Sequence, residues 1–534
     1  MKKAFSSLAL LGLSLISTTN AVELQAILIE SPEAIQRGKN FKGVAIQDLK
    51  LPTKERVLSD RLKPFLGQEI STEMLLQIKS EIVSYYVEHR QPYLLVEIPE
   101  QDVTNGRVKY IVLHGAIGKI QFVGNRWFSD KLLGKYLRVQ SQDMVDEYQL
   151  LKDIASLNRN PFHHSQLILE PGGKPGETNI EILTEDKFPL RIFGGADNTG
   201  NPFTGNSRYF AGFNWGNAFF VNDVLTYQFT TADNYKKFWS HFGSYTSLLR
   251  NGHTCFLYGG YSEIHPHIRH FKSEGKSYQG SLRYIVPTGP SHTNLSQEFS
   301  FGLDVKGMNS SLFFSDLTGP IPVSTHLANL SQLVLAYGLQ HKSSHDELSL
   351  NLELFGSPAK SIANQNKQRF NEIRPHALPQ YIYARLFLGN IWTLPMKFAL
   401  ATNLRLQGTH NPLMPSEQFG LGGYNTVRGY AEHAFNADTA LCANLELRMP
   451  PIKVFPQKSA LTFLAFIDYG LGHNFKNDFH EVPSTEFLIG AGPGVRYEIY
   501  PYLSLRADYG FKFHKFVNSG PGEGKFHFSA TASY

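Results

Sequence analysis

The stretch that decides the fold is Leu503-Ser504-Leu505-Arg506-Ala507-Asp508-Tyr509-Gly510-Phe511-Lys512-Phe513. Its odd positions carry apolar side chains, and its even positions carry polar side chains or glycine. Because successive side chains of a β-strand point to opposite faces, this alternation predicts a strand with one apolar and one polar face. Residues 348–354, 397–406 and 440–449 alternate in the same way. The chain after residue 188 is therefore predicted to be almost wholly β-structure.

A transmembrane barrel and a soluble β-sandwich would both produce such alternation. The polar faces here carry charges of both signs at neighbouring positions, such as Arg506 and Asp508, which suits a water-filled lumen. Several strands reach ten or more residues, about the length of a tilted membrane-crossing strand. Aromatic residues make up 13% of the chain and favour β-structure and interfacial girdles. We predict an all-β transmembrane barrel over residues 188–534, with a sandwich as the alternative.

The last strand has an aromatic face. Phe526, Phe528 and Tyr534 share one side of it, and Tyr534 is the final residue. We predict that this strand closes the barrel and carries the signal that the outer-membrane barrel assembly machinery reads. The alternative is an ordinary edge strand that ends in an aromatic residue.

The N-terminus has the pattern of a secretory signal peptide. Lys2-Lys3 precede an apolar stretch over residues 8–16, and small residues lie near Ala21. This pattern predicts a signal peptide over residues 1–21, with an uncleaved anchor as the alternative. No later segment offers the roughly 20 apolar residues of a membrane helix. A short N-terminal segment, residues 22–41, then leads to the first domain.

Residues 42–115 and 116–187 repeat one plan, β-α-α-β-β, which predicts two α+β domains. Thr53 is expected to cap the first helix of the first repeat. The second strands of the repeats, near 93–98 and 165–170, are expected at sheet edges. Exposed edges can pair with an extended chain by β-augmentation.

Composition excludes several functions. The net charge of +5 is spread along the chain and gives nucleic-acid binding no support. Cys255 and Cys442 are the only cysteines, so a disulfide framework is excluded and at most one bridge can form. The sequence has no Gly-x-Ser-x-Gly elbow and no carboxylate pair in a defined cleft. We predict no catalytic site, no cofactor and no enzymatic activity.

A histidine cluster reads His265-Pro266-His267-Ile268-Arg269-His270. Imidazoles can ligate a metal. Here proline interrupts the run, and no carboxylate or thiol is expected to complete the ligand set. We therefore predict a loop or lumen face and no metal site.

Two further segments suggest an internal contact. The first reads Gly422-Gly423-Tyr424-Asn425-Thr426-Val427-Arg428-Gly429-Tyr430, and the second reads Phe466-Ile467-Asp468-Tyr469-Gly470. Asp468 lies on the polar face of an alternating strand, and the guanidinium of Arg428 matches a carboxylate. We hypothesise that a loop re-enters the lumen and that Val427, Arg428, Gly429 and Tyr430 dock on the strand bearing Phe466, Asp468 and Gly470. The alternative is a solvated arginine and one lumen charge among many.

Three alternating glycines, Gly490, Gly492 and Gly494, share a strand face with Arg496. Such glycines leave a groove without side chains, where the loop tip could rest. On this hypothesis, Gly492→Leu impairs transport while the barrel still assembles. Ordinary strand bends at a barrel corner are the alternative.

At this point the chain resembles the two-partner secretion transporters of the haemolysin-secretion and filamentous-haemagglutinin type, within the superfamily of outer-membrane assembly factors. The resemblance covers the chain from about residue 42 to the end. The motifs that carry it occur in family order: Leu157-Asn158-Arg159-Asn160-Pro161, Leu169-Glu170-Pro171-Gly172, Pro175-Gly176-Glu177-Thr178, Asp197-Asn198-Thr199-Gly200, Thr204-Gly205, Val427-Arg428-Gly429-Tyr430 and Phe466-Ile467-Asp468-Tyr469-Gly470.

The resemblance implies two periplasmic POTRA domains, over residues 42–115 and 116–187, followed by an outer-membrane barrel of about 16 strands. It implies a secreted partner of adhesin or haemolysin type, captured by the POTRA domains and exported unfolded through the lumen. The short N-terminal segment departs from the family, because it leaves little room for the usual plug helix. Two other functions stay open, a barrel assembly factor and a passive porin. Assembly factors usually carry more POTRA domains, and a porin needs neither periplasmic domains nor an inner loop.

Overall fold

The computed structural model describes residues 22–32, 42–89, 91, 93–174, 176–201, 204–268, 271–288, 294–316, 319–454, 458–476, 483–515 and 524–534. The predicted signal peptide lies outside these residues. Among them, no helix is both long and apolar enough to cross a membrane. Tertiary contacts divide the chain into two compact units, and the boundary runs through the second sequence repeat. Residues 139–149 and 168–181 belong with the N-terminal unit, whereas 122–138 and 150–167 belong with the barrel.

The first repeat is a four-stranded sheet with two helices and a short 3-10 turn. Its elements are β1 (Ala26–Glu30), β2 (Gly43–Gln47), α1 (Glu55–Leu62), η1 (Lys63–Phe65), α2 (Thr72–Glu88), β3 (Leu94–Glu97) and β4 (Arg107–His114). The strand order is β2-β1-β4-β3, so β3 is at an edge as predicted. Leu58, Ile78 and Val112 belong to the fully buried core between helices and sheet.

Two details of the first repeat differ from the sequence prediction. Strand β1 pairs in parallel with both β2 and β4, so this sheet begins before residue 42. Strand β1 has only five residues, Ala26–Glu30, which are too few for the alternation of a strand to stand out in the sequence. Thr53 does not cap α1, because Lys54 holds the cap position and the Thr53 hydroxyl bonds the Tyr85 hydroxyl at 2.8 Å. Ser71 caps α2 by accepting a hydrogen bond from the Met74 amide.

The second repeat has the predicted order of elements. They are β5 (Ala116–Val123), α3 (Asp130–Gly134), α4 (Glu147–Leu157), β6 (His163–Pro171) and β7 (Glu177–Asp186). The strand order β5-β7-β6 places β6 at an edge. The prediction that both second strands are edge strands is therefore confirmed.

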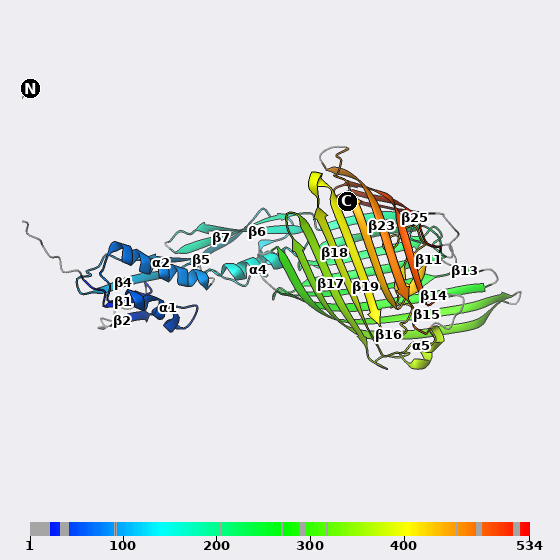
Figure 1. The fold of residues 1–534 in the computed structure, drawn as a ribbon, viewed down its shortest axis with the longest axis horizontal. Helices are drawn as coiled ribbons and strands as arrows, with labels where there is room; N and C mark the ends of the chain where they lie inside the picture. Colours follow the sequence, from blue (N-terminus) through cyan, green and yellow to red (C-terminus); the bar gives the residue numbers. More distant parts are fainter. Residues whose placement is uncertain are drawn as a thin grey trace, which may run out of the picture. The chain divides into compact units, whose positions relative to one another are not determined.

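Within the described residues, 16 antiparallel strands close into a barrel (Figure 1). They are β8 (Leu190–Asp197), β9 (Arg208–Ala218), β10 (Asp223–Ala232), β11 (Phe238–Leu248), β12 (Thr254–Ile264), β14 (Phe271–Thr288), β15 (Leu295–Asp316), β16 (Gly319–Lys342), β17 (Asp346–Ser357), β18 (Tyr381–Thr393), β19 (Ala399–Thr409), β22 (Thr439–Arg448), β23 (Ser459–His473), β24 (Thr485–Ile499), β25 (Leu503–Lys512) and β26 (Lys525–Ser533). A two-residue piece, β13 (His267–Ile268), extends the pairing of β14. The first and last strands close the ring, with Ser529 opposite Asp197 and Ser533 opposite Phe193.

The two faces of the strands differ as the alternation predicted. On β23, Phe463 and Ile467 are 42% and 56% exposed on the outside, whereas Asp468 is fully buried on the inside. An apolar outer face and a polar inner face identify the arrangement as a membrane barrel and exclude the sandwich.

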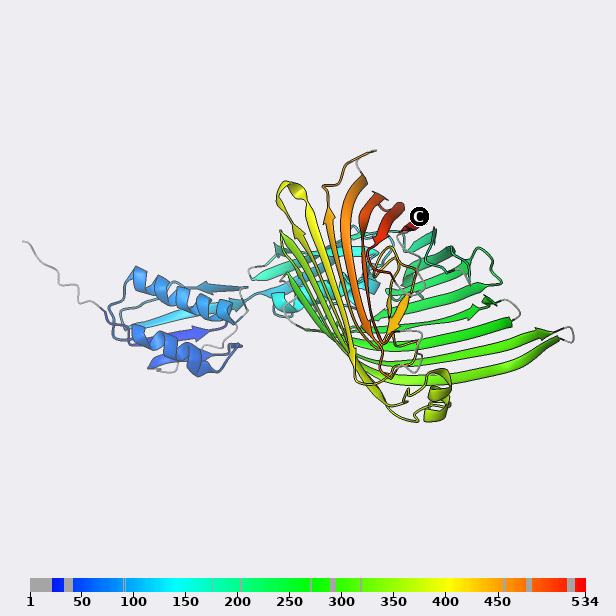
Figure 2. The same cartoon turned by 45° about the vertical axis from the view of Figure 1, so that its right-hand side comes forward.

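The longest connection joins β19 to β22 and holds a small hairpin, β20 (Phe419–Leu421) with β21 (Phe435–Ala437). An earlier connection, between β17 and β18, contains the helix α5 (Lys367–Ile373), which packs on β16 through Phe370. The neighbouring strands β15 and β16 extend well beyond the rest of the barrel wall (Figure 2).

Candidate functional site

The tip of the connection between β19 and β22 lies against the inner wall of the barrel. Arg428 donates from Nε to Asp468 Oδ2 at 2.7 Å and from Nη2 to Asp468 Oδ1 at 2.8 Å. Its backbone N–H also donates to Asp468 Oδ2, at 3.0 Å. The structure thus brings together the arginine and aspartate that the sequence singled out, in a two-pronged contact.

Sequence reasoning missed the other partners of this guanidinium. Arg428 Nη1 donates to Glu446 Oε1 at 2.7 Å and lies 3.6 Å from Asp508 Oδ2. The ring of Phe466 covers its face, with 3.5 Å between Cζ and the ring centroid. Glu446 and Asp508 both lie on the polar faces of alternating strands. This shared orientation toward the lumen could have identified them as further partners of Arg428.

Neighbouring arginines balance these carboxylates. Arg448 bonds Glu446 at 2.7 Å, and Arg496 and Arg506 bond Asp508 at 2.6 and 2.8 Å. A buried network of this kind adds little net stability, but it fixes one geometry and makes the loss of any partner costly. The tip therefore has one defined resting position on the wall.

The other residues of the tip are also held. Val427 is fully buried in an apolar cluster with Leu421 and Cys442. The amide of Gly429 donates to His527 Nε2 at 3.0 Å. The Tyr430 hydroxyl donates to the carbonyls of Ile489 and His514, at 3.1 and 2.8 Å.

Glycines on the wall allow the tip to approach closely. Of the three predicted glycines, only Gly490 contacts the tip, and two others, Gly470 and Gly510, also do so. A Cβ on Gly490 would collide with the carbonyl of Arg428, and a Cβ on Gly470 would come within 2.8 Å of Val427. Gly510, which the sequence analysis did not select, lies directly against the backbone of Gly429.

Gly492 and Gly494 do not touch the tip. A Cβ on either residue would collide with the adjacent strand β25, at Tyr509 or Asp508. The hypothesis that Gly492→Leu tests docking of the loop therefore needs correction, because that substitution would disturb the strand pairing first.

A second cluster holds the base of the same connection. Glu417 is fully buried and accepts hydrogen bonds from Lys306 at 2.9 Å, Tyr383 at 2.6 Å and Gln332 at 3.2 Å. Asp438, also fully buried, pairs with Arg374 and accepts from the Leu413 amide at 2.9 Å. Nothing in the local sequence pattern identified these anchors, because their partners come from strands far away in the chain.

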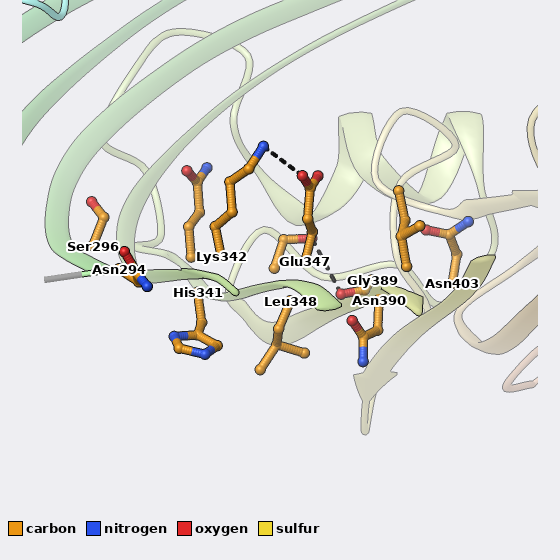
Figure 3. A pocket seen from close by; sticks show the side chains of 12 residues that line it. Asn294, Ser296, His341, Lys342, Glu347, Leu348, Gly389, Asn390 and Asn403 are labelled. Carbon is orange, nitrogen blue, oxygen red and sulfur yellow. Dashed lines mark hydrogen bonds and ion pairs between the residues drawn. The ribbon is translucent and has the colours of Figure 1, made fainter. Parts of the chain in front are cut away.

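A polar recess of about 540 Å³ lies on the barrel wall at the ends of β15 to β19. Lys342 and Glu347 are two of its lining residues and form an ion pair at 2.5 Å. Ser296 and Asn403 lie to either side of this pair (Figure 3). His341 and Leu348 point away from this group (Figure 3). Most of the residues that line the recess are polar, but Leu348 and Ile391 also belong to the lining.

The junction of the second repeat with the barrel uses the Asn-Arg-Asn-Pro motif. Asn160 is fully buried, and its amide donates to the carbonyl of Gly216 at 2.7 Å and to Asn222 Oδ1 at 2.8 Å. His163 Nε2 also lies 2.9 Å from Asn222 Oδ1, and burial lowers the pKa of this imidazole. Tyr136 donates to the Val221 carbonyl at 2.8 Å, and burial raises its pKa to about 12.

The remaining candidates are placed as follows. Phe526 and Phe528 stack on the outer face of β26, and the Tyr534 side chain is 91% exposed. Cys255 and Cys442 are free thiols and do not pair.

The histidine cluster is less isolated than the sequence suggested. Glu263, His265 and Glu274 lie with their ligand atoms within 4.8 Å of one another. The statement that no carboxylate completes the set was therefore wrong, because strand pairing brings Glu274 beside Glu263. Lys276 forms ion pairs with both carboxylates, at 2.8 Å from Glu274 and 3.8 Å from Glu263. Arg269 and His270 lie outside the described residues.

The fold and the loop latched inside it define a class, the outer-membrane transporters with periplasmic POTRA domains. Residues 176–497 match the family described as haemolysin secretion/activation protein ShlB/FhaC/HecB, and the chain belongs to this family. Its similarity extends to the heme/hemopexin transporter protein HuxB of Haemophilus influenzae, at 25% identity over 81% of this chain and 78% of the relative. The outer membrane transporter CdiB of Dickeya dadantii is 21% identical over 81% of this chain and 75% of the relative.

Solved structures show the same fold. CdiB from Escherichia coli superposes with a TM-score of 0.76 at 14% identity, covering 98% of this chain and 92% of that chain. CdiB from Acinetobacter baumannii gives 0.69 at 17% identity, covering 96% and 90%. The chain is thus a two-partner secretion transporter of the bacterial outer membrane, with POTRA domains in the periplasm, and it exports a partner exoprotein. Its family consists of transporters.

Proposed function

We propose that the loop tip is a latch, which closes the lumen at rest and leaves the wall when the exoprotein passes. The observation that carries the proposal is the contact of Arg428 with Asp468, Glu446 and Asp508 in the interior of the barrel. A transporter for an extended chain must keep its lumen closed when no client is present. A loop held by polar contacts on a glycine-floored wall can do this and can still be displaced.

Client capture is assigned to the two POTRA domains. The edge strands β3 and β6 offer unpaired backbone groups, which bind extended chains with little dependence on sequence. Tyr93 and Leu95 near β3, together with Leu169 and Pro171 of β6, line one cavity of about 560 Å³. An unfolded exoprotein of adhesin or haemolysin type would pair here before it enters the lumen. The driving energy would come from its folding outside the cell, because the periplasm supplies no nucleotide.

Biogenesis would use the aromatic face of β26. We assign Phe526, Phe528 and Tyr534 to recognition by the barrel assembly machinery, because all three project from the outer face of the closing strand.

A disulfide tests the latch. The side chain of Val427 comes within 2.8 Å of a Cβ built on Gly470, so cysteines at these two positions can reach bonding distance. In a background with Cys255→Ser and Cys442→Ala, the double variant Val427→Cys and Gly470→Cys should stop secretion when oxidised and regain it on reduction. Val427→Cys alone is the matched control. Unchanged secretion by fully cross-linked protein would refute the latch.

A further inference from the structure

The turn between β5 and α3 presents an aromatic side chain to solvent. Trp127 is 40% exposed, and Arg126 lies over its ring at 4.8 Å. The carboxylate of Asp186 accepts hydrogen bonds from the amides of Arg126, Trp127 and Phe128, at 2.9, 2.6 and 3.0 Å. These three bonds hold the turn, so the exposed position of Trp127 is built into the fold.

Trp127 joins the lipid-facing surface of the barrel. Its ring packs edge-on against Phe188, with 5.0 Å between centroids, and Phe188 is 56% exposed. Phe188 lies two residues before Leu190, the first residue of β8. The outward residues Leu190 and Ile192 are 38% and 59% exposed. Two residues of extended chain span about 7 Å, so Trp127 lies at the inner end of the apolar band.

The adjacent turn of the barrel continues the same rim. Trp215 is directly opposite Leu190 in the strand register. Phe219 and Phe220, in the turn between β9 and β10, are 61% and 77% exposed and lie 5.3 and 6.2 Å from the Trp215 ring. These rings and the Trp127–Phe188 pair lie at the same end of β8 and β9, and together they form an aromatic rim. Tryptophan and other amphipathic aromatic residues favour the boundary between headgroups and acyl chains.

We propose that the second POTRA domain is itself a membrane-binding module, which inserts Trp127 into the periplasmic leaflet of the outer membrane. Arg126, held over the indole ring, then lies at the level of the lipid phosphates, where a guanidinium can donate two hydrogen bonds. The occupant of this rim is a phospholipid, because the rim is continuous with the lipid face of the barrel and carries a cation beside its aromatic groups. This anchorage would hold the domain at the membrane in addition to the Asn160 contacts.

Lipid-borne quenchers test the proposal on the full-length protein in vesicles. The chain has four tryptophans, so Trp215→Phe, Trp239→Phe and Trp392→Phe leave Trp127 alone. In phosphatidylethanolamine–phosphatidylglycerol vesicles with brominated acyl chains, Trp127 should lose most of its emission, and it should resist acrylamide in the aqueous phase. The protein that retains only Trp215 is the lipid-facing reference, and free N-acetyltryptophanamide is the solvent reference.

A charge variant tests whether Arg126 contributes to lipid binding in addition to the aromatic residues of the rim. Arg126→Glu in the single-Trp127 background should weaken quenching by brominated lipid, and more strongly in vesicles rich in phosphatidylglycerol than in those without it. Quenching of Trp127 by acrylamide but not by brominated lipid would overturn the proposal. Protection of Trp127 that depends on added exoprotein, and not on the lipid, would assign the rim to a protein partner and would overturn it equally.

Discussion

The tip and the base of the long loop are held by opposite chemistry. At the tip, the loop brings a cation, Arg428, to carboxylates on the wall. At the base, the loop brings carboxylates, Glu417 and Asp438, to cations and hydroxyls elsewhere in the barrel. On the wall around the tip, Glu446 and Asp508 also pair with arginines of the wall. At the base, Glu417 is the ion-pair partner of Lys306 among the described residues.

This difference indicates how the loop can move. When Arg428 leaves, Asp508 and Glu446 keep Arg496, Arg506 and Arg448 as partners. When Glu417 leaves, Lys306 loses its ion-pair partner in a buried site. We therefore expect the tip to move and the base to stay during transport.

The largest expected effect is at the tip. Asp468→Ala removes the main partner of a buried guanidinium, a change that costs about 3–5 kcal/mol at buried pairs. We expect the tip to leave the wall and the single-channel conductance in planar bilayers to rise. Asp223→Ala is the matched control, since Asp223 is also a buried wall carboxylate but bonds Tyr245 and the Leu248 amide. Equal conductance of the two variants would contradict the distinction.

A smaller effect is expected at the base. Glu417→Ala leaves Lys306 and Tyr383 without their carboxylate and should destabilise the base by about 3–5 kcal/mol, as for other broken buried pairs, but it leaves the contacts of the tip in place. The outer part of the loop should become sensitive to protease added to intact cells, while conductance stays near that of the native protein. An increase in conductance as large as that of Asp468→Ala would show that tip and base act as one unit.

A still smaller effect is expected when only a wall residue that contacts the tip is changed. Gly490→Ala places a methyl group against the carbonyl of Arg428 and should raise the single-channel conductance slightly, because it weakens the resting position of the tip. Gly408→Ala is the control, because no atom lies within 4 Å of a Cβ at that position. If both variants conduct like the native protein, the close contact at Gly490 has no part in holding the tip.

The smallest effect lies at the junction with the second repeat. Burial lowers the pKa of His163 below its ordinary value of 6.5, so the unfolded junction binds more protons. The stability that the neutral imidazole supplies is present above pH 6.5 and is lost as the pH falls below it. Limited proteolysis of the junction should therefore accelerate on mild acidification. His163→Gln should remove most of this pH dependence, and an unchanged profile would assign it to another group.

The sequence predicted the barrel and the contact of Arg428 with Asp468 because both rest on local regularities. Alternation along β23 and β25 places Asp468 and Asp508 in the lumen without any knowledge of the neighbouring strands. The anchors at Glu417 and Asp438 could not be predicted, since Lys306 and Arg374 reach them only through the closed ring. Strand β1 was missed for a related reason, as its five residues gain their pairing from β2 and β4. The glycines that contact the tip were predicted only in part. Gly510 reaches the tip through the register between strands, and the sequence of a single strand does not show that register.

The boundary between the compact units has a practical meaning for anyone who wishes to isolate the barrel. A truncation at residue 188 follows the sequence repeats, but it removes Asn160 and Phe162 from the inner turn of β9 and β10. Asn222 would lose the amide that donates to it, and Gly216 would lose the ring that covers it. Such a fragment would expose polar and apolar groups of the β9–β10 turn that the intact chain covers. Its stability and conductance would then reflect this exposed turn as well as the barrel itself.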